Sequence, residues 1–170
     1  MDYMLERERI AVGEILFDGC QEQPIDIDIN LPDYCPDIQR ILKCQIYPKI
    51  SSRSITGDRL MLDGSYTVKI FYLDPEGMCV RCHECDDSYT AEIALKQQAE
   101  NAMVSAFARV EYVNCRASSP RRLNVHGSFS LCAKVISTGQ CEMVSNICGS
   151  DVEQQKLQTT AYELVGFAQQ

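Results

Sequence analysis

Apolar and polar residues alternate along most of the chain with a period of two. Between Ile25 and Leu31, apolar residues alternate with aspartate and asparagine, which is typical of a strand with one buried and one solvated face. Between Leu60 and Tyr72 the apolar residues again share one parity, so their side chains point to one face. Gly64 interrupts this pattern, and a glycine there marks a bend, a bulge or a close backbone approach. The alternation predicts a fold built from β-strands.

The strand around Gly64 has a counterpart later in the chain. When Gly127 is placed on Gly64, an offset of 63 residues, Arg59-Leu60 falls on Arg122-Leu123. Both copies place a set of turn-forming residues just before this strand. Further pairs that agree in type are Ile50 with Val113, Ser65 with Ser128, and Tyr66 with Phe129. We interpret the two copies as an internal duplication of a strand-hairpin unit.

The duplicated units span about 46–95 and 109–150, and we expect both to lie in a single β domain at 1–150. The expected fold is all-β, either an antiparallel β-sandwich or an open barrel. Residues 153–166 resemble residues 6–19 in their residue pattern, with a charged start followed by short alternating apolar residues. The segment 151–170 is therefore expected to be a C-terminal tail or the start of a following module.

Few segments carry a helix signal. Pro36–Leu42 has proline and aspartate at a suitable first turn and apolar residues at helical spacing, which predicts one short helix. Gln97–Ala106 is rich in helix formers, but from Val104 onward the apolar residues alternate, which favours a strand for its second half. Asp74–Gly77 has the composition of a tight turn.

Composition and charge narrow the function classes. The chain has 170 residues, of which 45% are hydrophobic and 24% charged, the balance of a soluble globular domain. Its formal net charge of -8 disfavours nucleic acid and anionic membrane surfaces as partners. No apolar run approaches the roughly 20 residues of a membrane helix, and the first residues are charged where a signal peptide is apolar. We expect a cytoplasmic protein that does not insert into membranes.

Ten cysteines leave two alternatives, a set of disulfides or a set of reduced thiols. Cys44 and Cys132 lie inside apolar alternating segments, where a free cysteine behaves as a small hydrophobic residue. The length of the chain also makes stapling by disulfides unnecessary. These observations favour the reduced state.

Cys79-x-x-Cys82-His83-x-Cys85 is the strongest candidate for metal binding, because thiolates and imidazole bind zinc. The spacing is not that of two separated ligand pairs, and in a strand Cys79 and Cys85 face away from Cys82. We therefore expect no metal and no other cofactor. His83 and His126 are the only histidines, and no nucleophile elbow, phosphate-binding glycine loop or zinc-protease motif occurs in the sequence. The chain is expected not to be an enzyme.

Two polar segments are candidates for binding. Asp33, Tyr34 and Asp37 lie in a short proline-flanked segment, which is either a rigid epitope or a helix entry with capping acids. Arg121 and Arg122 follow Pro120, and arginine favours bidentate contacts with carboxylates. This basic pair is therefore expected to contact either a partner or one of Asp33 and Asp37 within the fold.

The strings Leu31–Leu42, Val110–Cys115 and Ser119–Leu123 resemble the SPOCS domain family, β-rich modules of spore-forming Clostridia, and within it the N-terminal region of SipL-like sporulation proteins. The similarity runs from about Glu6 to Val144. It implies a structural role in spore envelope assembly, in the mother-cell cytoplasm at the forespore surface, and no active site. Such relatives end in a LysM domain that contacts a coat ATPase. Nothing in this sequence resembles that domain, so this contact is expected to lie outside the chain.

The leading hypothesis is a non-catalytic interaction or scaffold module for spore envelope assembly. Its expected partners are spore morphogenesis proteins, and exposed sheet edges would also allow self-association into a homo-oligomer. The alternative is a carbohydrate-binding or peptidoglycan-associated β-sandwich. The absence of tryptophan from the sequence, and the core parity of most tyrosines, argue against that alternative. A small hydrolase built on the abundant carboxylates is the third reading, and no residues single it out.

Overall fold

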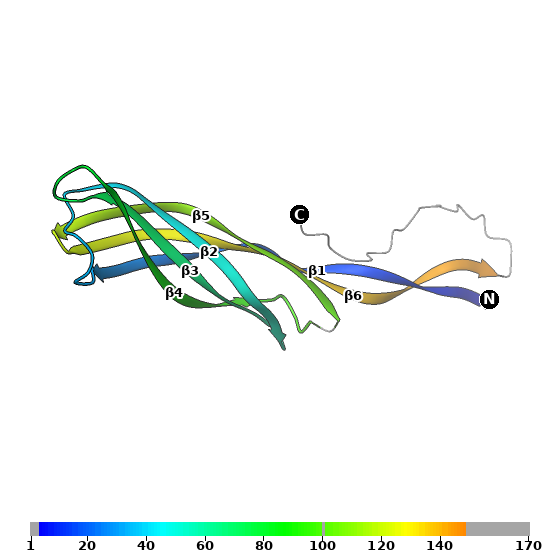
Figure 1. Cartoon of the computed structure of the whole chain (residues 1–170). Coiled ribbons are helices and arrows are strands. Elements are labelled where there is room, and N and C mark those ends of the chain that lie inside the picture. Colours follow the sequence, from blue (N-terminus) through cyan, green and yellow to red (C-terminus); the bar gives the residue numbers. More distant parts are fainter. Residues whose placement is uncertain (1–3, 100, 149–170) are drawn as a thin grey trace.

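The computed structural model describes residues 4–99 and 101–148, which form six strands and no helix. The strands are β1 (Met4–Asn30), β2 (Arg40–Thr56), β3 (Arg59–Leu73), β4 (Val80–Ala94), β5 (Ala102–Ser119) and β6 (Arg122–Cys148). They form two antiparallel three-stranded sheets, with strand orders β1-β6-β5 and β2-β3-β4 (Figure 1). The predicted all-β fold is confirmed, as a sandwich of two sheets.

The core lies between the sheets and is built from the central strand of each. In β3 and β6 every second side chain points inward, as the alternating sequence requires. The inward residues that are fully buried include Leu60, Leu62, Val68, Ile70, Leu123, Val125, Leu131 and Val135. Phe129 of β6 joins the sheets, because its ring centroid lies 5.7 Å from that of Tyr66 and 5.0 Å from that of Tyr89.

The two glycines of the duplicated unit occupy equivalent places. Gly64 pairs with Ile50, and Gly127 pairs with Val113. A Cβ on Gly64 would collide with the Lys49 carbonyl oxygen, and one on Gly127 would lie 2.7 Å from the equivalent carbonyl in β5. In both sheets glycine is therefore required by a close backbone approach. The duplication does not extend to the third strand of each sheet, which is β4 in one sheet and β1 in the other.

The short helix predicted at Pro36–Leu42 is wrong. The chain stays extended there, because the Ile38 amide donates to the Pro120 carbonyl at 2.7 Å and the Gln39 amide donates to the Leu73 carbonyl at 2.9 Å. The Ile38 side chain is also buried in the core. Backbone partners from β3 and the β5–β6 turn replace the internal hydrogen bonds of a helix.

Two local predictions are confirmed. The second half of the Gln97–Ala106 segment is a strand, because β5 begins at Ala102. The turn at Asp74–Gly77 closes with a hydrogen bond of 2.9 Å from the Gly77 amide to the Asp74 carbonyl. Gly77 has φ +68°, a conformation that glycine adopts without strain. The predicted tail or following module at 151–170 lies outside the described residues.

A disulfide corrects the prediction that the cysteines are reduced. Cys20 and Cys132 are bonded, with an S–S distance of 2.07 Å. They are direct partners in the antiparallel β1–β6 register, although 112 residues separate them in sequence. A pairing between strands so far apart along the chain leaves no local signal. The free cysteines among the described residues are Cys35, Cys44, Cys79, Cys82, Cys85, Cys115 and Cys141.

Strands β1 and β6 extend well beyond the sandwich. Each has 27 residues, and the pairing of β5 with β6 ends at the Ala102–Ser137 pair. Beyond that point, residues 4–13 of β1 and 138–148 of β6 continue as a two-stranded ribbon, which we call the arm (Figure 1). Leu16 lies at the bulge where the arm leaves the sandwich, and its side chain is fully buried in the core.

Candidate functional site

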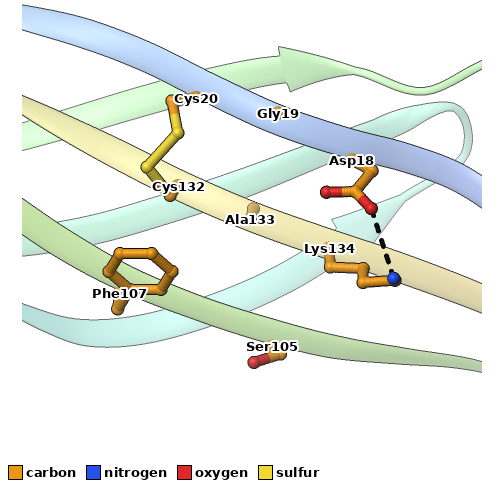
Figure 2. Close-up of a pocket in the computed structure, with 8 residues that line it drawn as sticks. All are labelled: Asp18, Gly19, Cys20, Ser105, Phe107, Cys132, Ala133 and Lys134. Atoms are coloured by element: carbon orange, nitrogen blue, oxygen red, sulfur yellow. Dashed lines mark ion pairs between the residues drawn. A yellow bond between two sulfur atoms is a disulfide. The ribbon is translucent and has the colours of Figure 1, made fainter.

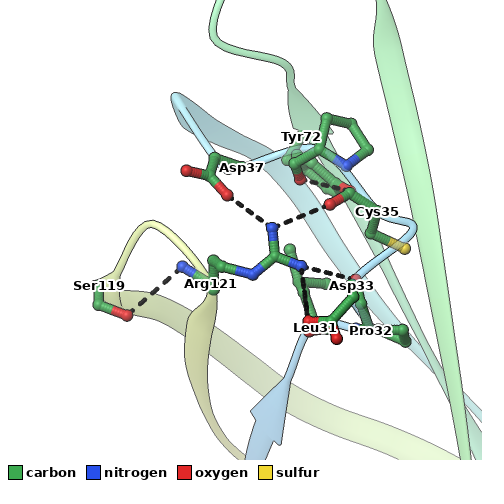
Figure 3. A network of polar contacts seen from close by, with 9 residues as sticks. Leu31, Pro32, Asp33, Cys35, Asp37, Tyr72, Ser119 and Arg121 are labelled. Carbon is green, nitrogen blue, oxygen red and sulfur yellow. Dashed lines mark hydrogen bonds and ion pairs between the residues drawn. The ribbon is translucent and has the colours of Figure 1, made fainter.

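At one end of the sandwich Arg121 holds the connection between β1 and β2, residues 31–39, which we call the clamp loop. Its guanidinium donates to the Asp37 carboxylate at 2.7 Å and lies 3.9 Å from the Asp33 carboxylate (Figure 3). It also donates to backbone carbonyls of the loop at 2.7–3.5 Å. These belong to Leu31, Pro32 and Cys35. A planar group with five donors fits this set of acceptors, which lysine would not.

Other contacts fix the same loop. The Tyr72 hydroxyl of β3 donates to the Pro36 carbonyl at 3.3 Å. Burial raises the pKa of Tyr72, so its hydroxyl stays protonated and able to donate at neutral pH. The Leu31 amide donates to the Arg121 carbonyl at 2.8 Å. The clamp loop is thus tied to both sheets and is a rigid part of the fold.

The clamp divides the sequence-predicted site residues into two groups. Arg121 and Asp37 face each other, which is the internal link anticipated as one alternative. Arg122 points elsewhere and donates from Nε to Asn30 at 3.1 Å. Asp33 and Tyr34 project into solvent, and Tyr34 is 86% exposed. Partner binding by these residues stays a prediction, and Tyr34 is the side chain best placed for it.

Replacement of Arg121 by alanine is expected to lower the free energy of unfolding by about 2 kcal/mol, because it removes several charge-assisted hydrogen bonds at once. Arg122→Ala is the matched control in the same turn. It removes one exposed hydrogen bond and is expected to cost less than about 0.5 kcal/mol. Urea unfolding followed by circular dichroism measures both values. Equal losses would show that the clamp contributes nothing beyond surface charge.

The arm is a second candidate binding surface, which no sequence motif indicated. Among the described residues no third strand pairs with it on either edge. It also carries apolar side chains in solvent: Met4 is 71% exposed and Val144 is 51% exposed. Arg7 and Arg9 both pair with Glu142, at 3.6 and 3.1 Å. Because these arginines are paired, the exposed apolar side chains are the part of the arm best suited to bind another protein.

Residues 37–118 match the family model described as SipL, SPOCS domain. The chain carries a SipL-like SPOCS domain. This confirms the family inferred from the motifs and indicates a sporulation-related role. Neither the curated proteins nor the solved structures contain a significant match.

The matched SPOCS segment covers only part of the sandwich. It begins at Asp37 in the clamp loop, includes β2, β3 and β4, and ends at Ser118 in β5. Strands β1 and β6 lie outside it, although they complete the second sheet and form the arm. Arg121 also lies outside it, whereas its acceptor Asp37 lies inside. The clamp therefore joins the matched segment to a residue outside it, and the arm lies entirely outside the matched segment.

A hollow lies on the outer face of the β1-β6-β5 sheet (Figure 2). Its volume is about 370 Å³, and it is bordered by the Cys20–Cys132 disulfide, the ring of Phe107 and a 3.2 Å ion pair between Lys134 and Asp18. Phe107 is 60% exposed. Because the two charges neutralise each other, the hollow offers mainly an apolar contact.

The candidate metal ligands on strand β4 do not point toward one common site. Cys82 is exposed, and Cys85 packs against the core on the opposite face of β4. Within the described residues no group of three or more potential metal ligands converges. Burial raises the pKa of Cys85 and lowers the pKa of His83, so both groups are neutral at pH 7. Across residues 4–99 and 101–148 there is no helix that could cross a membrane.

Proposed function

We propose that this chain is a non-catalytic scaffold module that joins spore morphogenesis proteins during assembly of the bacterial spore envelope. The SPOCS family match supports the link to sporulation. The proposed place of action is the mother-cell cytoplasm, at the surface of the forespore. The net charge of -8 supports protein partners over nucleic acid or anionic lipid.

The single observation that carries the proposal is the arm. An isolated two-stranded ribbon is only marginally stable in water, and the arm has no sheet or helix packed on it within the described residues. An edge of the arm with which no described strand pairs can accept a strand from another protein, and the apolar side chains of the arm can be covered at the same time. We therefore assign the arm as the contact surface, and the partner as a protein that adds a strand to it.

The test compares proteins captured by the intact chain and by an arm variant in sporulating cells. Leu5→Lys/Val144→Lys places charges on two exposed apolar positions of the ribbon. After cross-linking, spore-envelope proteins recovered with the variant are expected to fall about tenfold, because lysine on an open edge opposes strand addition. Mass spectrometry identifies and counts the captured proteins.

Tyr47→Lys is the matched control, because Tyr47 is an exposed apolar residue on the outer face of the other sheet. It is expected to capture the same proteins as the unmodified chain. Sedimentation of the purified chain separates self-association from binding to another protein. The proposal fails if the arm variant captures the same envelope proteins as the control, or if neither captures any.

A further inference from the structure

Two free thiols lie opposite each other where the two sheets meet. Cys44 is in β2 and Cys115 is in β5, so each belongs to a different sheet. Strands β2 and β5 approach within 8 Å, Cα to Cα, along this edge of the sandwich. Both side chains are half-buried and pack against the core. They are therefore shielded but still within reach of a small molecule.

The packing of neighbouring residues fixes how these strands face each other. The Ile46 Cδ1 atom and the Val113 Cα atom lie 3.1 and 3.2 Å from the same point, the position of a Cβ on Gly127. Ile46 therefore packs beside Val113. Strands β2 and β5 run in opposite directions (Figure 1). Cys44, two residues before Ile46, then comes opposite Cys115, two residues after Val113, and on the same inner face.

A side-chain hydrogen bond links the two thiols. This hydrogen bond lowers the pKa of Cys44. The same bond, together with burial, raises the pKa of Cys115. Thiol–disulfide exchange would then begin at Cys44, the thiol with the lowered pKa, and end at Cys115.

We propose that Cys44 and Cys115 are a redox-active pair that closes to a disulfide between the two sheets when the chain meets a low-molecular-weight disulfide. The Cys44 thiolate attacks one sulfur of that disulfide, forms a mixed disulfide and releases the first small thiolate. Cys115 then loses its proton, and its sulfur attacks Cys44 and displaces the second. The two cysteines are oxidised, the small disulfide is reduced to two thiols, and no other reactant is needed.

Closure would lock the edge at which β2 and β5 meet. The clamp loop ties the sheets at one end, and the aromatic cluster around Phe129 joins them in the middle. A covalent link at Cys44 and Cys115 would restrain sliding or opening of the sheets along the remaining edge. We expect the thermal midpoint to rise by about 5–10 °C on closure, because the link restricts the unfolded chain.

The experiment treats the whole chain with oxidised glutathione, alkylates the remaining thiols, and maps the peptides by mass spectrometry. The expected product is a peptide pair joined through Cys44 and Cys115, together with the upward shift of the thermal midpoint. In Cys115→Ser the resolving sulfur is absent, so glutathione is expected to stay bound to Cys44. Cys85→Ser is the matched control, because Cys85 is also a half-buried thiol against the core but lies in β4.

Two results would overturn the proposal. One is a wild-type chain that gains glutathione on the exposed Cys79 or Cys82 while Cys44 and Cys115 both remain alkylatable. The other is glutathione retained on Cys44 to the same extent in the wild type and in Cys115→Ser. If the serine variant does not fold, the wild-type peptide map alone decides. The outcome is independent of the arm, so it neither supports nor weakens the proposed scaffold function.

Discussion

Removal of the Cys20–Cys132 disulfide, as Cys20→Ala/Cys132→Ala, is expected to lower the free energy of unfolding by about 4 kcal/mol. The bond joins residues 112 positions apart, and a cross-link that closes so long a loop strongly restricts the unfolded chain. Cys132 is also almost fully buried, so its sulfur contributes packing. Urea unfolding at equilibrium gives the value, and far-UV circular dichroism is a suitable signal because the chain lacks tryptophan.

Two controls define this measurement. Cys79→Ala/Cys82→Ala changes two exposed free thiols and is expected to alter stability by less than about 0.5 kcal/mol. A reductant should bring the unfolding midpoint of the wild type down toward that of the disulfide variant and leave the variant itself unchanged. A wild-type midpoint that does not respond to reductant, in a chain whose thiols all alkylate, would show that Cys20 and Cys132 are not bonded.

Gly64→Ala is expected to cost about 3 kcal/mol, because the added methyl group has no space to occupy. It would meet the Lys49 carbonyl oxygen, which the strand pairing holds in place, and the Tyr89 hydroxyl at 2.5 Å. The side chain of Tyr89 can move, but the backbone oxygen can shift only if the β2–β3 register distorts. The free energy of unfolding of this variant is measured in urea as above.

Gly139→Ala is the matched control for the glycine prediction. A Cβ there meets only the Val12 side chain, at an ordinary distance of 3.9 Å, so stability should change by less than about 0.5 kcal/mol. Gly127→Ala should be costly too, because Gly127 faces a backbone oxygen in the second sheet just as Gly64 does in the first. A harmless Gly64→Ala would mean that the backbones do not approach as closely as the structure shows.

The strands were predictable because their signal is local. The shared parity of Leu60–Tyr72 needs only the residues themselves, and it correctly indicated which side chains are buried. The match of Gly127 to Gly64 was also visible, since it compares two stretches of sequence. The structure adds the reason for the match, a strand crowded against each glycine. Pattern alone left open whether the glycines marked a bend, a bulge or a close approach.

Features that depend on partners distant in sequence were not predictable. The proline and aspartate at Pro36 and Asp37 favour a helix when read locally, but Arg121 and the Pro120 carbonyl hold that segment extended. The Cys20–Cys132 bond follows from the β1–β6 register, which no single segment encodes. The arm escaped notice for another reason. Its residues alternate like those of any strand, and only the start of β5 at Ala102 shows that no third strand of the described residues pairs with them.

The pairing of β1 with β6 has a consequence for synthesis. Strands β2, β3 and β4 are consecutive hairpins, so their sheet can form as soon as they leave the ribosome. Strand β1 is made before them, yet its partner begins only at Arg122. Until β6 has been made, the backbone groups of β1 have no partner strand in the same chain. When two chains are made close together, β6 of one can capture β1 of the other, so the same pairing that completes a single sandwich is also a route to strand-exchanged dimers.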